Sequence, residues 1–324
     1  MSEGDSQLSN PFSTGGGGFL FEARVQASFV VLMLAGGFIP YLPRWPINKI
    51  KLQAKSGDYN TDDMVVFLKG NDNNQNCKML AQIKHSITIS ETNKVFREVI
   101  QSAWTDYNNN GLFKKNKDVI ALITGPLSAT DINDVRTLLE WSRHMENSKE
   151  FFTNVEKAKF SSNNKRKKLK AFKAQLQNAN GGNPVTEEEL FDFLKHFHLL
   201  GYDLDIKSSI TVSLLHSLIG QYSQDNISAL WGQIIEEVLS FNQNAGTITL
   251  ENLPADLCNH FKKKIYETIP EEYLPSKTES KIIDWNQHKC ASDLAMANLI
   301  GSWDENNESD LGIIKEVVIG DLDE

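Results

Sequence analysis

Hydrophobic and polar positions near the start of the chain follow first a helical and then a strand-like pattern. In FLFEARVQASFVVLMLAGG, residues 19–37, hydrophobic side chains recur every three or four positions, and Gly36-Gly37 ends the pattern. The segments that follow, INKIKLQAKSG, DMVVFLKG and KMLAQIKHS, have the composition and length of strands. We therefore expect one helix and then three strands.

The next part of the chain predicts another helix and another strand. Residues 91–108 have an amphipathic helical pattern, with apolar positions at Val95, Val99, Ile100 and Trp104. The later segment DVIALITGPLS is a continuous apolar run, which is typical of a buried and parallel central strand. This order of elements predicts an α/β fold in which helices flank a mixed sheet.

Beyond Asp131 the hydrophobic pattern is mainly helical. The predicted helices are DINDVRTLLEWSRHME, EEELFDFLKHFHLL, SALWGQIIEEVLSF and ADLCNHFKKKIYETI. His196 and His198 fall on the second of them, where we expect a packing or surface role. We divide the chain into a flexible N-terminus (1–17), an α/β core (18–145) and a mainly helical extension (146–324).

Composition narrows the class of protein. The chain has 324 residues, 40% of them hydrophobic, and a formal net charge of −9. This charge argues against a surface coated for nucleic acid, although a local basic site remains compatible with it. Three cysteines without a CxxC pair predict a reducing, cytoplasmic location. The N-terminus lacks a basic signal-peptide region, and the apolar run 29–35 is too short to span a membrane.

The candidate chemistry lies in two neighbouring predicted strands. Asp62 and Asp63 begin one of them, and Gln82 and Lys84 share one face at the end of the next. Carboxylate and carbonyl oxygens, including the backbone oxygen of Ile83, are the ligands that Mg²⁺ prefers. A lysine beside such an ion can orient a water molecule and stabilise developing negative charge. The alternative is an ordinary hairpin with charged ends.

The first predicted helix adds a second source of polar groups. Glu22 and Gln26 are four residues apart and therefore share a face of an otherwise apolar helix. An inward-facing glutamate needs a cation as a partner, and a metal ion would provide it. The alternative is a glutamate that simply stabilises the start of its helix.

These residues, in this order, resemble the PD-(D/E)XK nuclease superfamily in its Mrr-like branch. The segments GGFLFEARVQA, TDDMVVFLKG, AQIKHS, VFREVIQSAWTDYNN and DVIALITGPLS are similar to the double-stranded DNA nucleases of CBASS defence and of antiviral STAND NTPases (Avs). The resemblance implies a restriction-endonuclease-like fold. It makes Asp63 the metal-binding aspartate, Lys84 the catalytic lysine and Gln82 the replacement for the usual second acid.

The resemblance also implies roles for the remaining residues of the site. Glu22 becomes the helix glutamate, and Asp62, Gln26 and His85 become supporting residues. On a strand Asp62 and Asp63 face opposite sides, and Asp63 is favoured because it directly precedes the apolar run. The expected ligands of Mg²⁺ or Mn²⁺ are then Asp63, Gln82, Glu22 and the Ile83 carbonyl.

The implied function is metal-dependent cleavage of double-stranded DNA with little sequence preference, as an antiphage defence effector. The implied partners are double-stranded DNA, further copies of the chain, and a STAND NTPase or another signal-activated assembly, with no membrane. Two alternatives stay open. One is a catalytically inactive, nuclease-like module that binds DNA or protein, which the neutral Gln82 favours. The other is a ribonuclease with the same site.

Two further groups of residues could bind a ligand. The segment 157–173 holds eight Lys or Arg and no acid; it could contact DNA phosphates or form an ordinary solvated helix. Its densest part is Lys165, Arg166, Lys167, Lys168 and Lys170. The mirrored pairs Cys258-x-His260 and His288-x-Cys290 have poor spacing for zinc. The chain contains no P-loop motif.

Overall fold

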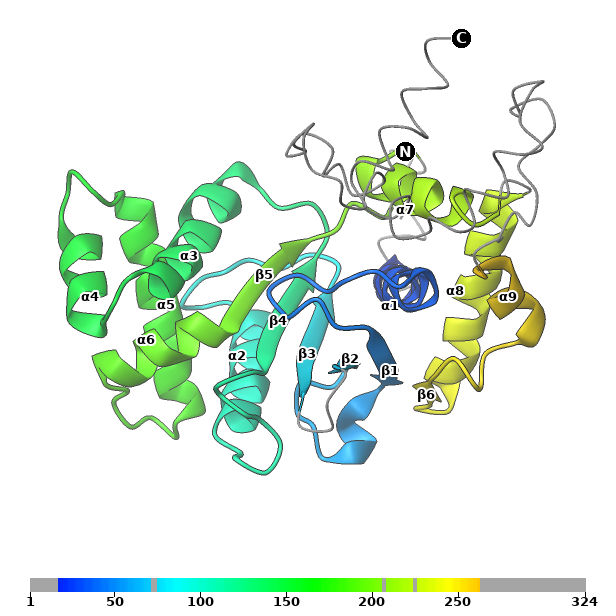
Figure 1. Ribbon diagram of the computed structural model, residues 1–324. Helices are drawn as coiled ribbons and strands as arrows, with labels where there is room; N and C mark the ends of the chain where they lie inside the picture. Colours follow the sequence, from blue (N-terminus) through cyan, green and yellow to red (C-terminus); the bar gives the residue numbers. More distant parts are fainter. Residues whose placement is uncertain (1–16, 71–74, 206–207, 224–225, 263–324) are drawn as a thin grey trace, which may run out of the picture. The chain divides into compact units, whose positions relative to one another are not determined.

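A six-stranded sheet organises the protein in a computed structural model that describes residues 17–70, 75–205, 208–223 and 226–262. The strands lie in the order β5-β4-β3-β2-β1-β6, and helices cover both faces (Figure 1). In chain order the strands are β1 (Ile47–Leu52), β2 (Met64–Lys69), β3 (Asn76–Lys84), β4 (Val119–Thr124), β5 (Phe197–Gly201) and β6 (Thr247–Ile248). The predicted α/β class with a mixed sheet is confirmed.

Strand direction changes at β3. The strands β1, β2 and β3 pair antiparallel, as do β1 and β6, whereas β4 pairs parallel with β3 and β5 parallel with β4. All six residues of β4 are buried, as its continuous apolar run predicts for a strand covered on both faces. Because β2 and β3 are antiparallel, the start of β2 lies beside the end of β3.

One face of the sheet packs against four helices. They are α1 (Gly17–Ala35), α7 (Ile210–Gly220), α8 (Ile227–Gln243) and α9 (Ala255–His260). Met64 and Val66 of β2 belong to this core, together with Phe29 of α1 and Ile234 of α8. By length and composition α1 could cross a membrane, but 61% of that stretch is buried inside the protein. Here α1 is used as a core helix, apolar on nearly all sides because the sheet and other helices surround it.

The opposite face carries the remaining long helices. They are α2 (Lys94–Tyr107), α3 (Thr137–His144), α4 (Ser148–Glu156), α5 (Asn163–Ala179) and α6 (Glu187–His196), with a π-helical turn, η3 (Asp131–Arg136), leading into α3. Side-chain caps begin several of them: Asn93 accepts from Phe96 N at α2, and Thr186 forms a capping box with Glu189 at α6. A short 3₁₀ helix, η2 (Ala54–Gly57), links β1 to β2.

The structure corrects the predicted helix at residues 187–200. The helix α6 ends at His196, and Phe197–Gly201 forms the edge strand β5. A segment as short as FHLL, residues 197–200, cannot distinguish strand from helix by periodicity, and pairing with β4 decides the outcome here. His198 therefore lies on a strand, only 2% exposed.

The sheet extends beyond the predicted core. Both β5 and β6 follow residue 145, so the predicted extension supplies the two outer strands. The described residues belong to one compact unit. Residues 1–16 of the predicted flexible N-terminus, and the part of the predicted extension after residue 262, lie outside the described residues.

Candidate active site

The Asp63 carboxylate is the centre of the candidate site. Asp63 directly precedes β2, and Gln82 and Lys84 occupy the end of β3. Its Oδ2 accepts hydrogen bonds from Gln82 Nε2 at 2.6 Å and from Ile83 N at 2.5 Å. Lys84 Nζ lies 3.4 Å from the same oxygen and forms an ion pair with it. The structure thus brings the predicted residues of the two strands together.

The two adjacent aspartates differ in their contacts. Asp63 is 8% exposed and makes the short contacts to β3, while Asp62 accepts a longer hydrogen bond, 3.5 Å, from the Gln82 amide. Both carboxylates thus face the same Gln82 amide, because the two residues precede β2 and the alternation expected within a strand does not apply to them. Of the two acids, Asp63 is the one that pairs with Lys84.

Helix α1 joins the site through Gln26 and Glu22. Gln26 is fully buried, and its Nε2 donates to the backbone oxygen of Asp63 at 3.0 Å and to Glu22 Oε1 at 3.1 Å. One helical turn separates the two side chains, so a single amide can contact both Glu22 and the strand. Gln26 therefore connects the helix glutamate to the Asp63 backbone.

Two further residues complete this network and were not predicted. Gln53, directly after β1, donates to Glu22 Oε1 at 2.7 Å. Asn242 of α8 donates to Gln26 Oε1 at 2.6 Å. The signal for Asn242 is present in the sequence, because it falls at helical spacing in the buried stripe Leu230, Ile234 and Val238. A polar residue in such a stripe indicates a buried hydrogen bond.

The backbone before Asp62 is held by Asp106 of α2. This carboxylate is fully buried and accepts from the Asn60 backbone N at 2.9 Å and from Thr61 N at 2.6 Å. The Asn60 side chain adds a third donor at 2.9 Å. Since a buried carboxylate requires such donors, Asp106 fixes the approach of the chain to β2 and so the position of Asp63.

Burial raises the pKa of both Glu22 and Asp63, and repulsion from a neighbouring aspartate adds to the shift of each. Burial, followed by repulsion from Asp63, raises the pKa of Glu22 to about 7, although Lys84 opposes this change. Burial is also the largest cause that raises the pKa of Asp63, against the charge of Lys84 and the hydrogen bond from Ile83 N. Such raised values are typical of a functional site that concentrates negative charge in low dielectric.

The donor set fits a hard divalent cation. Mg²⁺ is commonly bound through one or two carboxylates with water and substrate phosphate as further ligands, and Asp63 and Glu22 supply two. Among the described residues, no group of three or more His, Cys, Asp or Glu side chains is arranged for a metal. Gln82 turns its amide nitrogen toward Asp63, so ligation by Gln82 would require its other atom, Oε1.

His85 lies beside the site and is held in place by residues that are not part of it. Its Nε2 is 2.7 Å from Asp205 Oδ2, and its ring packs edge-on against Phe21 of α1, with centroids 5.3 Å apart. Arg24 of α1 contacts Asp205 Oδ1 at 3.4 Å. The loop after β5 is thereby tied to α1 and to the end of β3 next to Lys84.

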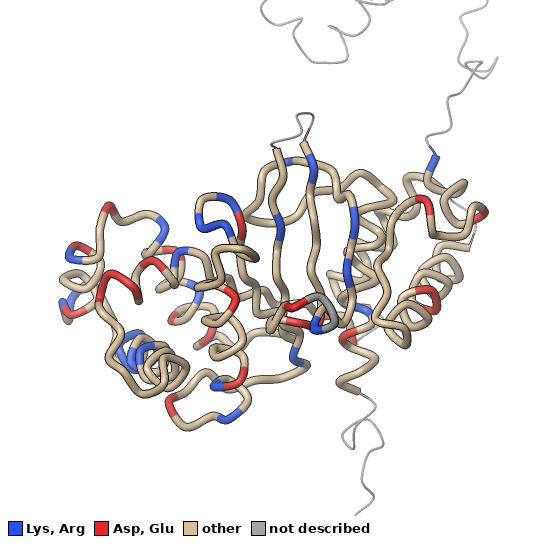
Figure 2. The backbone as a smooth tube through the Cα atoms, turned by 90° about the horizontal axis from the view of Figure 1, so that it is seen from below, with Lys and Arg blue, Asp and Glu red and all other residues tan. Residues whose placement is uncertain are grey.

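The densest part of the basic segment, residues 165–170, lies in the first half of α5, and part of its charge is neutralised. Lys165 pairs with Asp134 at 3.2 Å and Lys168 with Asp131 at 3.4 Å, while Lys167 and Lys170 are exposed. Arg166 donates to the Ser161 carbonyl at 3.0 Å. Figure 2 shows acidic and basic positions interspersed through the helical part of the molecule. Among residues 165–170, Lys167 and Lys170 are therefore the ones best placed to meet DNA.

The zinc alternative involves residues in two parts of the chain. Cys258 and His260 lie on the short helix α9, and the Cys258 thiol lies 3.7 Å from the Leu250 carbonyl oxygen. His288 and Cys290 lie outside the described residues.

Comparison with known proteins adds a partial likeness of fold. No protein-family model and no curated protein matches the chain. A structure of the Acinetobacter baumannii Cap4 SAVED/CARF-domain receptor with the cyclic trinucleotide 3'3'3'-cAAA aligns with a TM-score of 0.43 and 12% identity, covering 72% of this chain and 44% of that chain. A second structure of this receptor, and one with 2'3'3'-cAAA, each give a TM-score of 0.41 and 11% identity over 72% of this chain. The chain spans less than half of the length of that receptor.

Proposed function

We propose that the protein is a metal-dependent nuclease of the PD-(D/E)XK type that cleaves double-stranded DNA. The observation that carries the proposal is the contact of Asp63 with Gln82 and Lys84 at the ends of two antiparallel strands. Gln82 Nε2 lies 2.6 Å and Lys84 Nζ 3.4 Å from the same oxygen, Asp63 Oδ2. Antiphage defence, as part of a signal-activated assembly, is its proposed context and rests on the resemblance of the sequence to nuclease effectors.

The residues have distinct roles in the proposed reaction. Asp63 and Glu22 hold the cation with their carboxylates, and a bound Mg²⁺ supplies Lewis-acid activation of the phosphate and of water. Lys84, whose side chain is 31% exposed, orients the attacking water and stabilises negative charge on the phosphate oxygens. Gln26 and Asp106 hold the backbone around Asp63, so the carboxylate needs little rearrangement when substrate arrives.

A binding module without catalysis is the second candidate. Gln82 is neutral where the superfamily usually has an acid, and the Gln82 nitrogen rather than its oxygen faces Asp63. Such a site would retain DNA through the exposed lysines of α5 without hydrolysing it. The two candidates differ in one measurable property, the Asp63-dependent loss of intact plasmid.

The proposal is tested by incubating the full chain with supercoiled plasmid in Mg²⁺ or Mn²⁺. We expect nicked and linear products from the wild-type protein, and a rate lowered by about 10²-fold or more in Asp63→Ala and Lys84→Ala, as for other removals of charged catalytic groups. The matched control is Lys69→Ala at the opposite end of β2, which should cleave at the wild-type rate. A parallel reaction with RNA separates the ribonuclease alternative.

Protein concentration is varied in the same assay, so that any assembly of copies is driven by mass action. Equal plasmid loss in wild type, Asp63→Ala and Lys84→Ala would reject the catalytic assignment. DNA retention without cleavage at every concentration would favour the binding module.

A further inference from the structure

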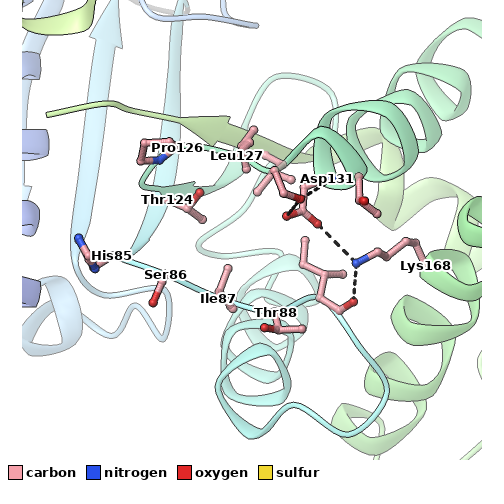
Figure 3. A pocket seen from close by; sticks show the side chains of 13 residues that line it. His85, Ser86, Ile87, Thr88, Thr124, Pro126, Leu127, Asp131 and Lys168 are labelled. Carbon is pink, nitrogen blue, oxygen red and sulfur yellow. Dashed lines mark hydrogen bonds and ion pairs between the residues drawn. The ribbon is translucent and has the colours of Figure 1, made fainter. Parts of the chain in front are cut away.

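A cavity of about 380 Å³ opens where β3 and β4 end. The segments that follow the two strands stay in contact for one more residue, where Gly125 N donates to the His85 carbonyl at 3.1 Å. They then separate into the segments 85–89 and 124–131, which form the walls shown in Figure 3. Ligand sites of open α/β sheets gather outside the carboxyl ends of parallel strands, and this cavity lies there.

The lining combines hydrogen-bonding and apolar groups. Hydroxyl side chains line it, among them Ser86, Thr88 and Thr124, and Leu127 and Leu199 supply apolar surface. At one end the Lys168 ammonium donates to the Ile89 carbonyl at 3.0 Å and to Asp131 at 3.4 Å. An ammonium has three donors, and these two contacts use two of them.

The cavity adjoins the candidate active site. Lys84 and Thr124 are partners in the β3–β4 register, and Thr124 lines the cavity. Neighbouring strands lie about 4.8 Å apart, so Lys84 and the cavity are separated by about one strand spacing. His85, the next residue after Lys84, is also part of the lining.

We propose that this cavity binds one nucleotide of the substrate strand, next to the phosphate that is cut. The nucleotide phosphate meets the Ser86 and Thr88 hydroxyls and Lys168, groups that commonly contact phosphate oxygens, while its sugar and base pack on the apolar wall. The volume lies within the range of about 300–1,000 Å³ for small-ligand sites. The inference rests on the proposed function and refines its substrate.

A nucleotide-binding cavity beside Lys84 would affect which DNA substrates the protein prefers. A base inside a duplex is stacked and paired, so placing its nucleotide in the cavity requires extrusion, which is least costly at a mismatched or unpaired base. The protein should therefore act preferentially at ends, mismatches or unpaired nucleotides in DNA.

The binding test uses the full chain in EDTA, which removes any contribution of a metal. Thymidine 5'-monophosphate, inorganic phosphate and thymidine are titrated by calorimetry and by NMR chemical shifts. The cavity is blocked by Thr88→Trp, and the matched control is Thr153→Trp on α4; both positions are exposed. We expect the wild type to bind the nucleotide saturably and more tightly than phosphate or thymidine. Thr88→Trp should weaken nucleotide binding about tenfold or more, and Thr153→Trp should leave it unchanged.

The cleavage test compares a fully paired duplex with one that carries a single unpaired nucleotide. We expect a lower KM for the second duplex in the wild type, and loss of that preference in Thr88→Trp. Absence of nucleotide binding, equal binding by Thr88→Trp, or binding of inorganic phosphate as tight as that of the nucleotide would each overturn the inference. Nucleotide binding that survives in Asp63→Ala, without DNA cleavage by the wild type, would instead reject the proposed function alone.

Discussion

Gln26 shows how a neutral side chain can organise a charged site. It is fully buried, and it contacts the Asp63 backbone, the Glu22 carboxylate and Asn242 through its one amide group. A buried amide needs such partners, because an unpaired polar group is costly in the interior. The Asn242 contact carries the link from α8 to the site.

Removing the Asn242 amide should lower both activity and stability, because it leaves the buried Gln26 Oε1 without its donor. In Asn242→Leu the side chain matches the apolar stripe of α8 in which it lies, but Gln26 Oε1 loses its donor and Gln26 is free to turn. We expect plasmid cleavage to slow about tenfold, which corresponds to about 1.4 kcal/mol in activation free energy. Cleavage rate and melting temperature are measured together, and a wild-type rate with unaltered melting would show that Asn242 does not position Gln26.

His198 predicts a pH dependence of stability. It is buried on β5 and stacked on Tyr41, with ring centroids 4.0 Å apart. Burial, followed by the nearby charge of Arg143, lowers the pKa of His198 to about 2. Its pKa in the unfolded chain is about 6.5. Between these values the unfolded state binds a proton that the folded state does not, so stability falls as the pH decreases below about 6.5.

The prediction is tested by urea unfolding at pH 7.5 and at pH 5.5. His198→Phe, which keeps a ring against Tyr41, should lose less stability than the wild type on acidification. The difference should approach about 1.4 kcal/mol per pH unit below 6.5. His144→Asn, whose side chain is exposed on α3, should behave as the wild type. Equal losses in the wild type and His198→Phe would contradict the role of His198.

At the scale of elements, the ends of β3 and β4 approach each other unusually closely. A Cβ added at Gly125 would lie 2.7 Å from the His85 carbonyl oxygen. The His85 oxygen and the Gly125 Cα that would carry the Cβ both belong to backbone held by the sheet. The contact therefore cannot be relieved by a side-chain rotation. Glycine is therefore required where the two strands separate to form the cavity.

The prediction compares two glycine substitutions. Gly125→Ala should destabilise the protein by about 1–3 kcal/mol, as overpacking usually does. Gly232→Ala on α8, where the added Cβ meets nothing within 4 Å, should stabilise it by about 0.5–1 kcal/mol. Urea denaturation measures both. Similar free energies of unfolding for the two variants would show that the β3 and β4 ends can separate at little cost.

At the scale of the whole molecule, DNA binding depends on the charge near the binding surface more than on the net charge. The net charge of −9 repels DNA, while Lys167 and Lys170 are exposed on α5. Since each phosphate contact contributes about −0.9 to the slope of log K against log salt concentration, the double variant Lys167→Ala/Lys170→Ala should reduce that slope by about 1.8. The control is the double variant Lys69→Ala/Lys114→Ala, in which both changes lie at the end of the sheet away from Asp63. It should keep the wild-type slope.

Fluorescence anisotropy with duplex DNA between 50 and 200 mM salt, a range in which phosphate contacts change affinity strongly, provides the measurement. An unchanged slope in Lys167→Ala/Lys170→Ala would remove α5 from the DNA-binding surface. An equal reduction in both double variants would indicate a general effect of protein charge instead.

The sequence by itself determined the features that depend on neighbours along the chain. Helical spacing located α1 and α2, the apolar run located β4, and residue order placed Asp63, Gln82 and Lys84 on consecutive strands. Glu22 and Gln26 were found because residues four apart share a helix face. These features are local, since periodicity and strand alternation are set within a few residues.

Only the tertiary structure decided what depends on residues far apart in the chain. It made Phe197–Gly201 a strand, because β4 offered backbone partners. It joined Asn242 to Gln26 across 216 positions of sequence, and it paired Asp63 rather than Asp62 with Lys84. The cavity beside Lys84 likewise joins Lys168 of α5 to the segments that follow β3 and β4. No local pattern encodes these contacts, because packing and sheet register are settled by the whole fold.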